Sequence, residues 1–203
     1  MTLPTIDQDY MLDFLTGLLN TPSPTGFTEA AIDFTEQALQ AFPEVTCGHT
    51  RKGGLLVKWI GEQDDHPRAL TAHVDTLGAM VKEIKSNGRL KLTKLGGYAW
   101  NTVEGEGVTV FTSDGNQIRG ALLLNKSSGH VYGAATNDTK RDDDAMEVRL
   151  DAITHKAEDT KALGIQVGDF VAFDPRVEIT NGFVRSRHLD DKACVANLVT
   201  AVK

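Results

Sequence analysis

The amino-acid sequence predicts an α/β fold that is interrupted by an all-β insert. Two segments near the start of the 203-residue chain carry apolar residues at helical spacing, and apolar strand-like runs follow them. Between about residues 82 and 182, short apolar runs alternate with turn sequences rich in glycine, asparagine and serine. Helical periodicity returns near residue 183. We therefore expect an α/β domain built from residues 1–81 and 183–203, with residues 82–182 inserted as a small barrel or sandwich.

The α/β part is expected to begin with two amphipathic helices. The first fits residues 8–20, and the turn Pro-Ser-Pro-Thr-Gly at residues 22–26 ends it. The second fits residues 29–42, with Thr28 as its N-cap. Strands are expected over residues 55–60 and 69–74, and a buried helix over residues 193–202.

Three predictions concern the insert. Residues 108–112 and 117–120 flank a Ser-Asp-Gly-Asn sequence and are expected to form a hairpin. Residues 163–171 are expected to turn into a further strand. The polar residues 137–144 are expected to form a solvated surface loop.

The composition excludes some partners. The chain has 21 basic and 28 acidic residues and a formal net charge of −7, which argues against binding nucleic acid or an anionic membrane surface. Its cysteines, Cys47 and Cys194, form no CxxC pair and are expected to be free thiols. The first residues lack the pattern of a signal peptide, and no apolar run reaches the roughly 20 residues of a membrane span. We expect a cytoplasmic protein.

The residues with the clearest chemical meaning are His73 and Asp75, at the end of the expected strand 69–74. A histidine can bind a metal ion through one ring nitrogen while a carboxylate fixes the other nitrogen. Asp190 and Asp191 lie at the entrance of the final predicted helix, where the helix dipole favours carboxylates. One of them could bridge two ions about 3.5–4 Å apart, and the residue pattern alone leaves open which one points inward.

The remaining histidines are weaker candidates. His188 lies close to the two aspartates and could contact a metal ligand from behind. His49 and His66 fall in expected loops and are predicted to be solvated. His130 and His155, inside the insert, are expected to lie on the surface or to contact a partner rather than to bind a metal ion.

Taken together, these motifs resemble the M42 family of dinuclear metallo-aminopeptidases. The resemblance rests on the sequence from His73 to Gly78 and on Leu-Asp-Asp-Lys at residues 189–192. The turn at residues 22–26, Lys-Gly-Gly-Leu at residues 52–55 and residues 163–169 match further segments in the same order. M20 enzymes also use His-x-Asp, but their bridging aspartate follows after a short interval. Here a long interval contains the all-β insert, which favours M42.

The resemblance implies a zinc-peptidase-like α/β sandwich whose inserted β domain mediates dimerisation. It implies two divalent ions, zinc or cobalt, with His73 as a ligand of one ion, Asp190 as the bridging ligand and Asp75 orienting His73. It also implies a peptide substrate and a homo-oligomer. In such enzymes a glutamate base and the other ligands follow the bridging aspartate, whereas this sequence has no glutamate after Glu178. We therefore expect the chain to match the N-terminal part of such an enzyme, with an incomplete sandwich, and to be inactive alone.

Two other functions stay open at this point. The chain could be a non-catalytic interaction module derived from such an enzyme, because the downstream ligands are missing. It could also belong to another co-catalytic metallohydrolase, such as a deacylase or a glycan hydrolase.

Overall fold

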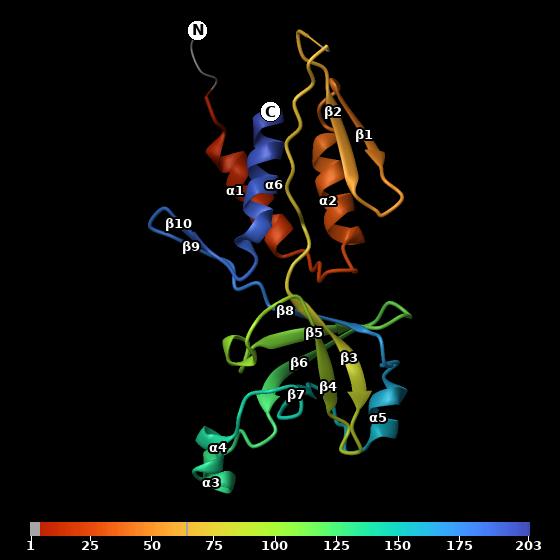
Figure 1. Cartoon of the computed structure of the whole chain (residues 1–203), viewed down its shortest axis with the longest axis vertical. Coiled ribbons are helices and arrows are strands. Elements are labelled where there is room, and N and C mark those ends of the chain that lie inside the picture. Colours follow the sequence, from red (N-terminus) through yellow and green to blue (C-terminus); the bar gives the residue numbers. More distant parts are fainter. Residues whose placement is uncertain (1–4, 64) are drawn as a thin grey trace. The chain divides into compact units, whose positions relative to one another are not determined.

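The computed structural model describes residues 5–63 and 65–203, which form two compact units (Figure 1). The first unit contains residues 5–76 and 175–203, and the second contains residues 77–174. The expected insert, residues 82–182, therefore differs from the second unit by a few residues at each end. The reason is that strand β3 (Gly78–Ile84) pairs with two other strands of this unit from its first residue onward. The α/β fold class with an all-β insert is confirmed.

The first unit combines helices with two short hairpins. Its elements are α1 (Gln8–Leu19), α2 (Glu29–Leu39), β1 (Val45–His49), β2 (Leu55–Trp59), β9 (Glu178–Thr180), β10 (Phe183–Arg185) and α6 (Leu189–Val202). Both hairpins are antiparallel pairs, β1 with β2 and β9 with β10. A hydrophobic core joins the three helices, with Leu18, Ala31 and Ala196 fully buried. These elements carry the segments that the candidate site uses.

The predicted helices are present with small differences. Asp7 caps α1, because its Oδ1 accepts a hydrogen bond of 3.0 Å from the Tyr10 backbone N–H. Helix α2 ends at Leu39, before the predicted residue 42. Thr28 occupies the N-cap position of α2, but its side chain makes no capping hydrogen bond.

The strand expected over residues 69–74 is wrong. Residues 67–75 run without regular secondary structure, and the bridge between Pro24 and Thr76 is the pairing recorded beside them in the described part of the chain. A strand is defined by hydrogen bonds to a neighbouring strand, and among the described residues hairpin β1–β2 forms a sheet of these two strands alone. The apolar residues Ala72 and Val74 of this segment nevertheless pack into the helical core.

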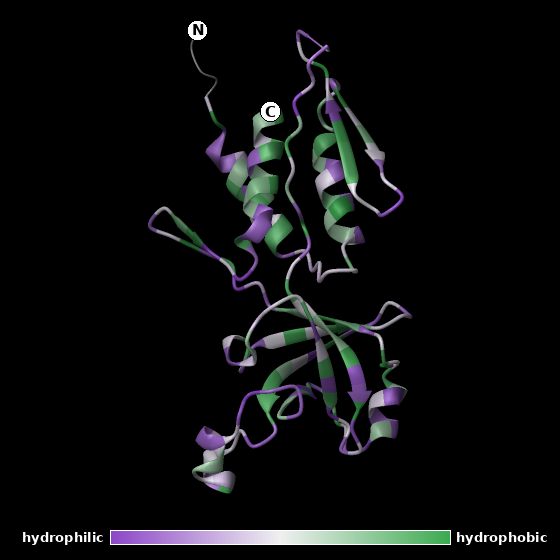
Figure 2. Ribbon diagram, in the orientation of Figure 1, coloured by the Kyte–Doolittle hydropathy of each residue, from purple (hydrophilic) through white to green (hydrophobic). Residues whose placement is uncertain are grey.

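The second unit is a closed barrel of six antiparallel strands in the order β3-β4-β7-β6-β5-β8. Its other strands are β4 (Leu90–Leu95), β5 (Gly107–Phe111), β6 (Gln117–Leu124), β7 (Met146–Leu150) and β8 (Phe170–Phe173), and its short helices are η1 (Trp100–Thr102), α3 (Gly129–Tyr132), α4 (Ala135–Asp138) and α5 (Ala157–Ala162). Pairing of β3 with β8 closes the barrel. Buried and more exposed residues alternate along β5 and β6, as expected when one face lines a core. Figure 2 shows apolar residues in the strands of this barrel. The predicted hairpin is β5–β6.

The polar segment 137–144 lies on the surface as expected, with no buried residue, but it is not entirely a loop. Helix α4 ends inside it, and three of its charged side chains bind the barrel wall. Asp143 accepts a 2.6 Å hydrogen bond from the indole of buried Trp100, and Asp144 pairs with Lys91. Arg141 donates to Glu104 over 2.8 Å. These charges therefore anchor the segment.

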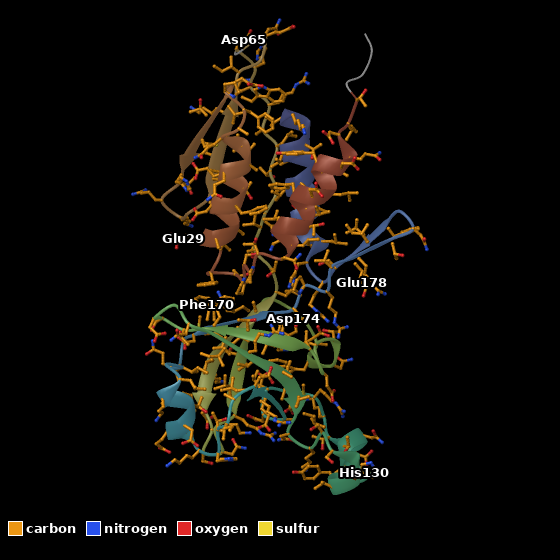
Figure 3. The ribbon with its side chains drawn as sticks, turned by 180° about the vertical axis from the view of Figure 1, so that it is seen from behind. Glu29, Asp65, His130, Phe170, Asp174 and Glu178 are labelled. Carbon is orange, nitrogen blue, oxygen red and sulfur yellow. The ribbon has the colours of Figure 1, made fainter. Side chains whose placement is uncertain are left out.

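The end of β8 is tied to the barrel by one ion pair. Asp174, labelled in Figure 3, accepts hydrogen bonds of 2.6 and 2.7 Å from the guanidinium of Arg119. A Cβ atom at Gly107 would lie 2.2 Å from the same carboxylate, so a larger residue there would displace this ion pair. Among the described residues, no helix is long and apolar enough to cross a membrane.

Candidate functional site

The segment that carries His73 and Asp75 is held against the turn after α1. The Thr76 N–H donates to the Ser23 carbonyl over 2.8 Å, and the Thr25 N–H donates to the Thr76 carbonyl over 3.2 Å. The buried Ser23 hydroxyl adds a 2.7 Å hydrogen bond to the carbonyl of Val74. The Pro-Ser-Pro-Thr-Gly turn therefore substitutes for a neighbouring strand at this point.

His73 lies between two carboxylates. Its Nδ1 is 3.0 Å from Asp75 Oδ1 and 3.1 Å from the Asp75 backbone oxygen. Its Nε2 is 3.3 Å from Asp190 Oδ1. The structure thus brings together the three residues that were singled out from the sequence. Their roles in binding metal stay a prediction.

The two adjacent aspartates face different parts of His73. The Asp190 carboxylate approaches the imidazole, whereas Asp191 Oδ2 accepts a long hydrogen bond of 3.4 Å from the His73 backbone N–H. Both residues have non-helical backbone angles within α6, so regular helix begins only after them. In this arrangement Asp190 is the one placed beside the ring nitrogen, and Asp191 holds the backbone that carries the ring.

The donors fit a divalent ion in kind and in spacing. Two ligands that each lie 2.0–2.1 Å from a tetrahedral ion are about 3.3 Å apart, and this is the distance between His73 Nε2 and Asp190 Oδ1. It is longer than the roughly 2.7–2.9 Å of a charge-assisted N–H···O hydrogen bond. In the part of the chain that the structure describes, however, no group of three or more His, Cys, Asp or Glu side chains is arranged to hold an ion.

The site is open to solvent. The side chain of Asp190 is 95% exposed, that of His73 is 52% exposed and that of Asp75 is 38% exposed. At such exposure water screens the attraction between these groups, so their proximity adds little to stability. The geometry therefore depends on the backbone contacts that position the residues.

One residue of the motif has a role that sequence reasoning missed. Lys192 is fully buried, and its ammonium donates hydrogen bonds of 2.9 Å to the Leu18 carbonyl and 2.7 Å to the Thr21 carbonyl. It thereby ties the start of α6 to the end of α1, where helix carbonyls lack internal partners. Burial lowers the pKa of Lys192 to about 8. The missed signal is its spacing with the buried residues Val195, Ala196 and Val199, which places it on one apolar stripe.

The remaining histidines and cysteines have mixed outcomes. His49 lies in β1 rather than in a loop, which corrects that part of the prediction, but its side chain is exposed as expected, with Nε2 2.8 Å from Glu36 Oε2. His66, His130 and His155 are exposed, as expected.

His188 is buried at the N-cap of α6, and a role behind the metal ligands stays a prediction. Both cysteines are free thiols, as expected. A hydrogen bond with Asp191 raises the pKa of the Cys194 thiol, with smaller effects from burial and from the charges of Asp191 and Asp190.

Comparison with known proteins identifies similar chains. The profile of a family described as M42 glutamyl aminopeptidase matches residues 53–203. A Bacillus subtilis protein named "Putative aminopeptidase YhfE" is 47% identical over 192 residues, which cover 94% of this chain and 55% of that protein. The chain therefore spans about half the length of this relative.

Two solved structures have the same fold. The TET aminopeptidase of a marine sediment Thaumarchaeota archaeon has a TM-score of 0.81 at 21% identity, covering 96% of this chain and 53% of that one. TET1 peptidase of Pyrococcus horikoshii has a TM-score of 0.78 at 22% identity, covering 95% of this chain and 55% of that one.

Proposed function

Because the chain belongs to the M42 glutamyl aminopeptidase family, we propose that it supplies part of the metal site of an aminopeptidase. The reaction is hydrolysis of the first peptide bond of a peptide substrate. The observation that carries the proposal is the position of the His73 imidazole, with Asp75 at one ring nitrogen and Asp190 at the other. Asp75 orients the ring from Nδ1, and Asp190 shares a metal ion with Nε2.

Each residue has a defined task in this proposal. Asp75 accepts the Nδ1 proton of His73, which keeps the proton on that nitrogen and leaves the Nε2 lone pair free for the ion. Asp190 supplies a carboxylate with two oxygens, one beside Nε2 and one free for a second ion. When bound, zinc or cobalt ions would polarise the scissile carbonyl and lower the pKa of a water molecule. Lys192 keeps the start of α6 in place against α1.

Completion of the site requires residues that these 203 positions do not supply. No glutamate follows Asp190, so the glutamate base implied by the resemblance is not among them. Proton transfer to the leaving amine needs such a group within hydrogen-bonding reach. We therefore propose that this chain alone binds metal weakly and does not hydrolyse peptides.

Assembly into a homo-oligomer is part of the same proposal. The TET1 peptidase of Pyrococcus horikoshii can assemble into a tetrahedron or a large octahedral shell. The closed barrel is the candidate contact element, since it is a complete unit with its own core. Sedimentation of the purified chain measures this directly.

Metal binding tests the proposed function. We expect cobalt(II) to bind the chain weakly by calorimetry and by its absorption spectrum. His73→Ala and Asp190→Ala should each remove that binding, because each removes one of two donors. His66→Ala is the matched control, since His66 is an exposed histidine elsewhere in the same unit. Binding that survives both site substitutions, or no binding at all, would contradict the metal site and favour a non-catalytic interaction module.

A further inference from the structure

The Thr25 side chain contacts Asp75, which in turn contacts His73. Its hydroxyl donates a 2.7 Å hydrogen bond to Asp75 Oδ2, while Oδ1 of the same carboxylate faces His73 Nδ1 at 3.0 Å. Both oxygens of Asp75 are therefore engaged, one on each side. We propose that Thr25 is a positioning residue that fixes the Asp75 carboxylate and, through it, the tautomer and orientation of His73. This inference rests on the proposed metal site.

The hydroxyl can be assigned to Asp75 by distance. The alternative acceptor, the Thr76 carbonyl, lies 3.5 Å from Thr25 Oγ1, at the limit for a hydrogen bond. A hydroxyl has one proton to donate, and the ionised carboxylate at 2.7 Å is the closer and stronger acceptor. The proton therefore points at Asp75.

The backbone keeps Thr25 in register with the site. Its N–H donates to the carbonyl of Thr76, the residue that follows Asp75, and the Thr76 N–H donates to the Ser23 carbonyl. These two bonds to Thr76 hold the turn beside Asp75, so the Thr25 hydroxyl is presented at a fixed place. This matters because Asp75 and His73 are partly exposed, so burial does not restrict their rotamers.

A second acceptor limits the size of the effect. The Asp75 backbone oxygen lies 3.1 Å from His73 Nδ1 and stays there when the carboxylate rotates away. Loss of the Thr25 hydroxyl should therefore weaken the hold on the ring rather than abolish it. Substitution of groups behind a metal ligand typically costs 10–100-fold in affinity, and for a group one step further away we expect about three- to tenfold.

The test uses the 203-residue chain with three variants. Thr25→Val removes the hydroxyl and keeps the branched shape, whereas Thr25→Ser restores the hydroxyl. Thr46→Val is the matched control, because Thr46 is an exposed threonine on β1 of the same unit. Nitrogen-15 NMR of the neutral, metal-free His73 ring measures the fraction of molecules with the proton on Nδ1. Cobalt(II) affinity is measured in parallel by titration.

The expected result is a shift of the ring proton toward Nε2 in Thr25→Val and a cobalt affinity about three- to tenfold lower. Thr25→Ser and Thr46→Val should match the unmodified chain in both measurements. A Thr25→Val chain with the unmodified tautomer ratio and affinity would overturn the role of Thr25. If His73→Ala leaves cobalt binding intact, the proposed metal site fails, while the tautomer measurement still decides what Thr25 does.

Discussion

The barrel unit (residues 77–174) and the helical unit (residues 5–76 and 175–203) differ in how many neighbours each of their strands hydrogen-bonds to. Each of the six barrel strands pairs with two neighbours, and the sheet closes on itself. In the helical unit each strand pairs with a single neighbour, and the segment that carries His73 is held by a turn, a bridge and side-chain contacts. We therefore expect the barrel to be the more stable unit, and the candidate site lies in the unit with fewer strand pairings.

The largest expected effect tests whether the barrel is stable by itself. Leu122 of β6 is fully buried in the barrel core, and Leu122→Ala should lower the free energy of unfolding of the barrel by about 2–5 kcal/mol. Amide hydrogen exchange, followed residue by residue, reports each unit separately. We expect faster exchange in β3–β8 and unchanged exchange in α1, α2 and α6.

The matched control is Leu56→Ala on β2, where the leucine is 54% exposed and the change should be within about 0.5 kcal/mol. If Leu122→Ala accelerates exchange equally in both units, the two units unfold together and the barrel is not stable independently of the helical unit.

The second prediction concerns how the unfolding free energy of each unit changes with pH. The pKa of Lys192 is about 8 in the folded chain because the side chain is buried, against about 10.4 in an unfolded chain. Between these values the unfolded state binds a proton that the folded state does not, so the stability of the helical unit rises with pH across this window. The difference between the two pKa values corresponds to a gain in unfolding free energy of at most about 3 kcal/mol. The two carbonyl acceptors favour the charged form of Lys192 and therefore reduce this gain.

The Lys192→Met variant is the control for this pH effect. It lacks the titrating ammonium, so its unfolding free energy should not rise over the same window. It should instead fall, because the raised pKa values of the Cys47 and Cys194 thiols let the unfolded chain lose those protons first. Tyr98 makes the barrel behave in the opposite way, because burial raises its pKa and the unfolded state loses the phenolic proton first. Barrel stability should therefore fall as the pH rises past about 10. Parallel pH profiles in the two units would contradict this assignment.

Local patterns in the sequence predicted much of the fold. Helical spacing over residues 8–20 and the alternating runs around Ser-Asp-Gly-Asn identified α1 and hairpin β5–β6, because both elements depend on contacts close in sequence. Strand β1 was missed, since Val-Thr-Cys-Gly-His is short and contains a glycine. The expected strand over residues 69–74 failed because pairing depends on a neighbour that the local sequence does not reveal.

The candidate site was predictable only in part. His73 and Asp75 are two residues apart, so the sequence itself suggests their contact. Their approach to Asp190 depends on how α6 packs on α1, and it was reached through the family resemblance. The hydroxyl of Thr25 and the buried ammonium of Lys192 were not identified, because each acts on a partner far away in the chain. Long-range polar contacts of this kind leave almost no local pattern.

The smallest of these effects concerns the turn that holds the site segment. Ser23 is 1% exposed, and its hydroxyl donates to the Val74 carbonyl over 2.7 Å. Ser23→Ala leaves that buried carbonyl without this donor and should cost the helical unit about 1–2 kcal/mol. Exchange of the Thr76 amide, which donates to the Ser23 carbonyl, should accelerate. Ser128→Ala, at an exposed barrel serine that makes no capping bond, is the control and should change neither unit. If Thr76 exchange is unchanged in Ser23→Ala, then something other than this turn holds His73 and Asp75.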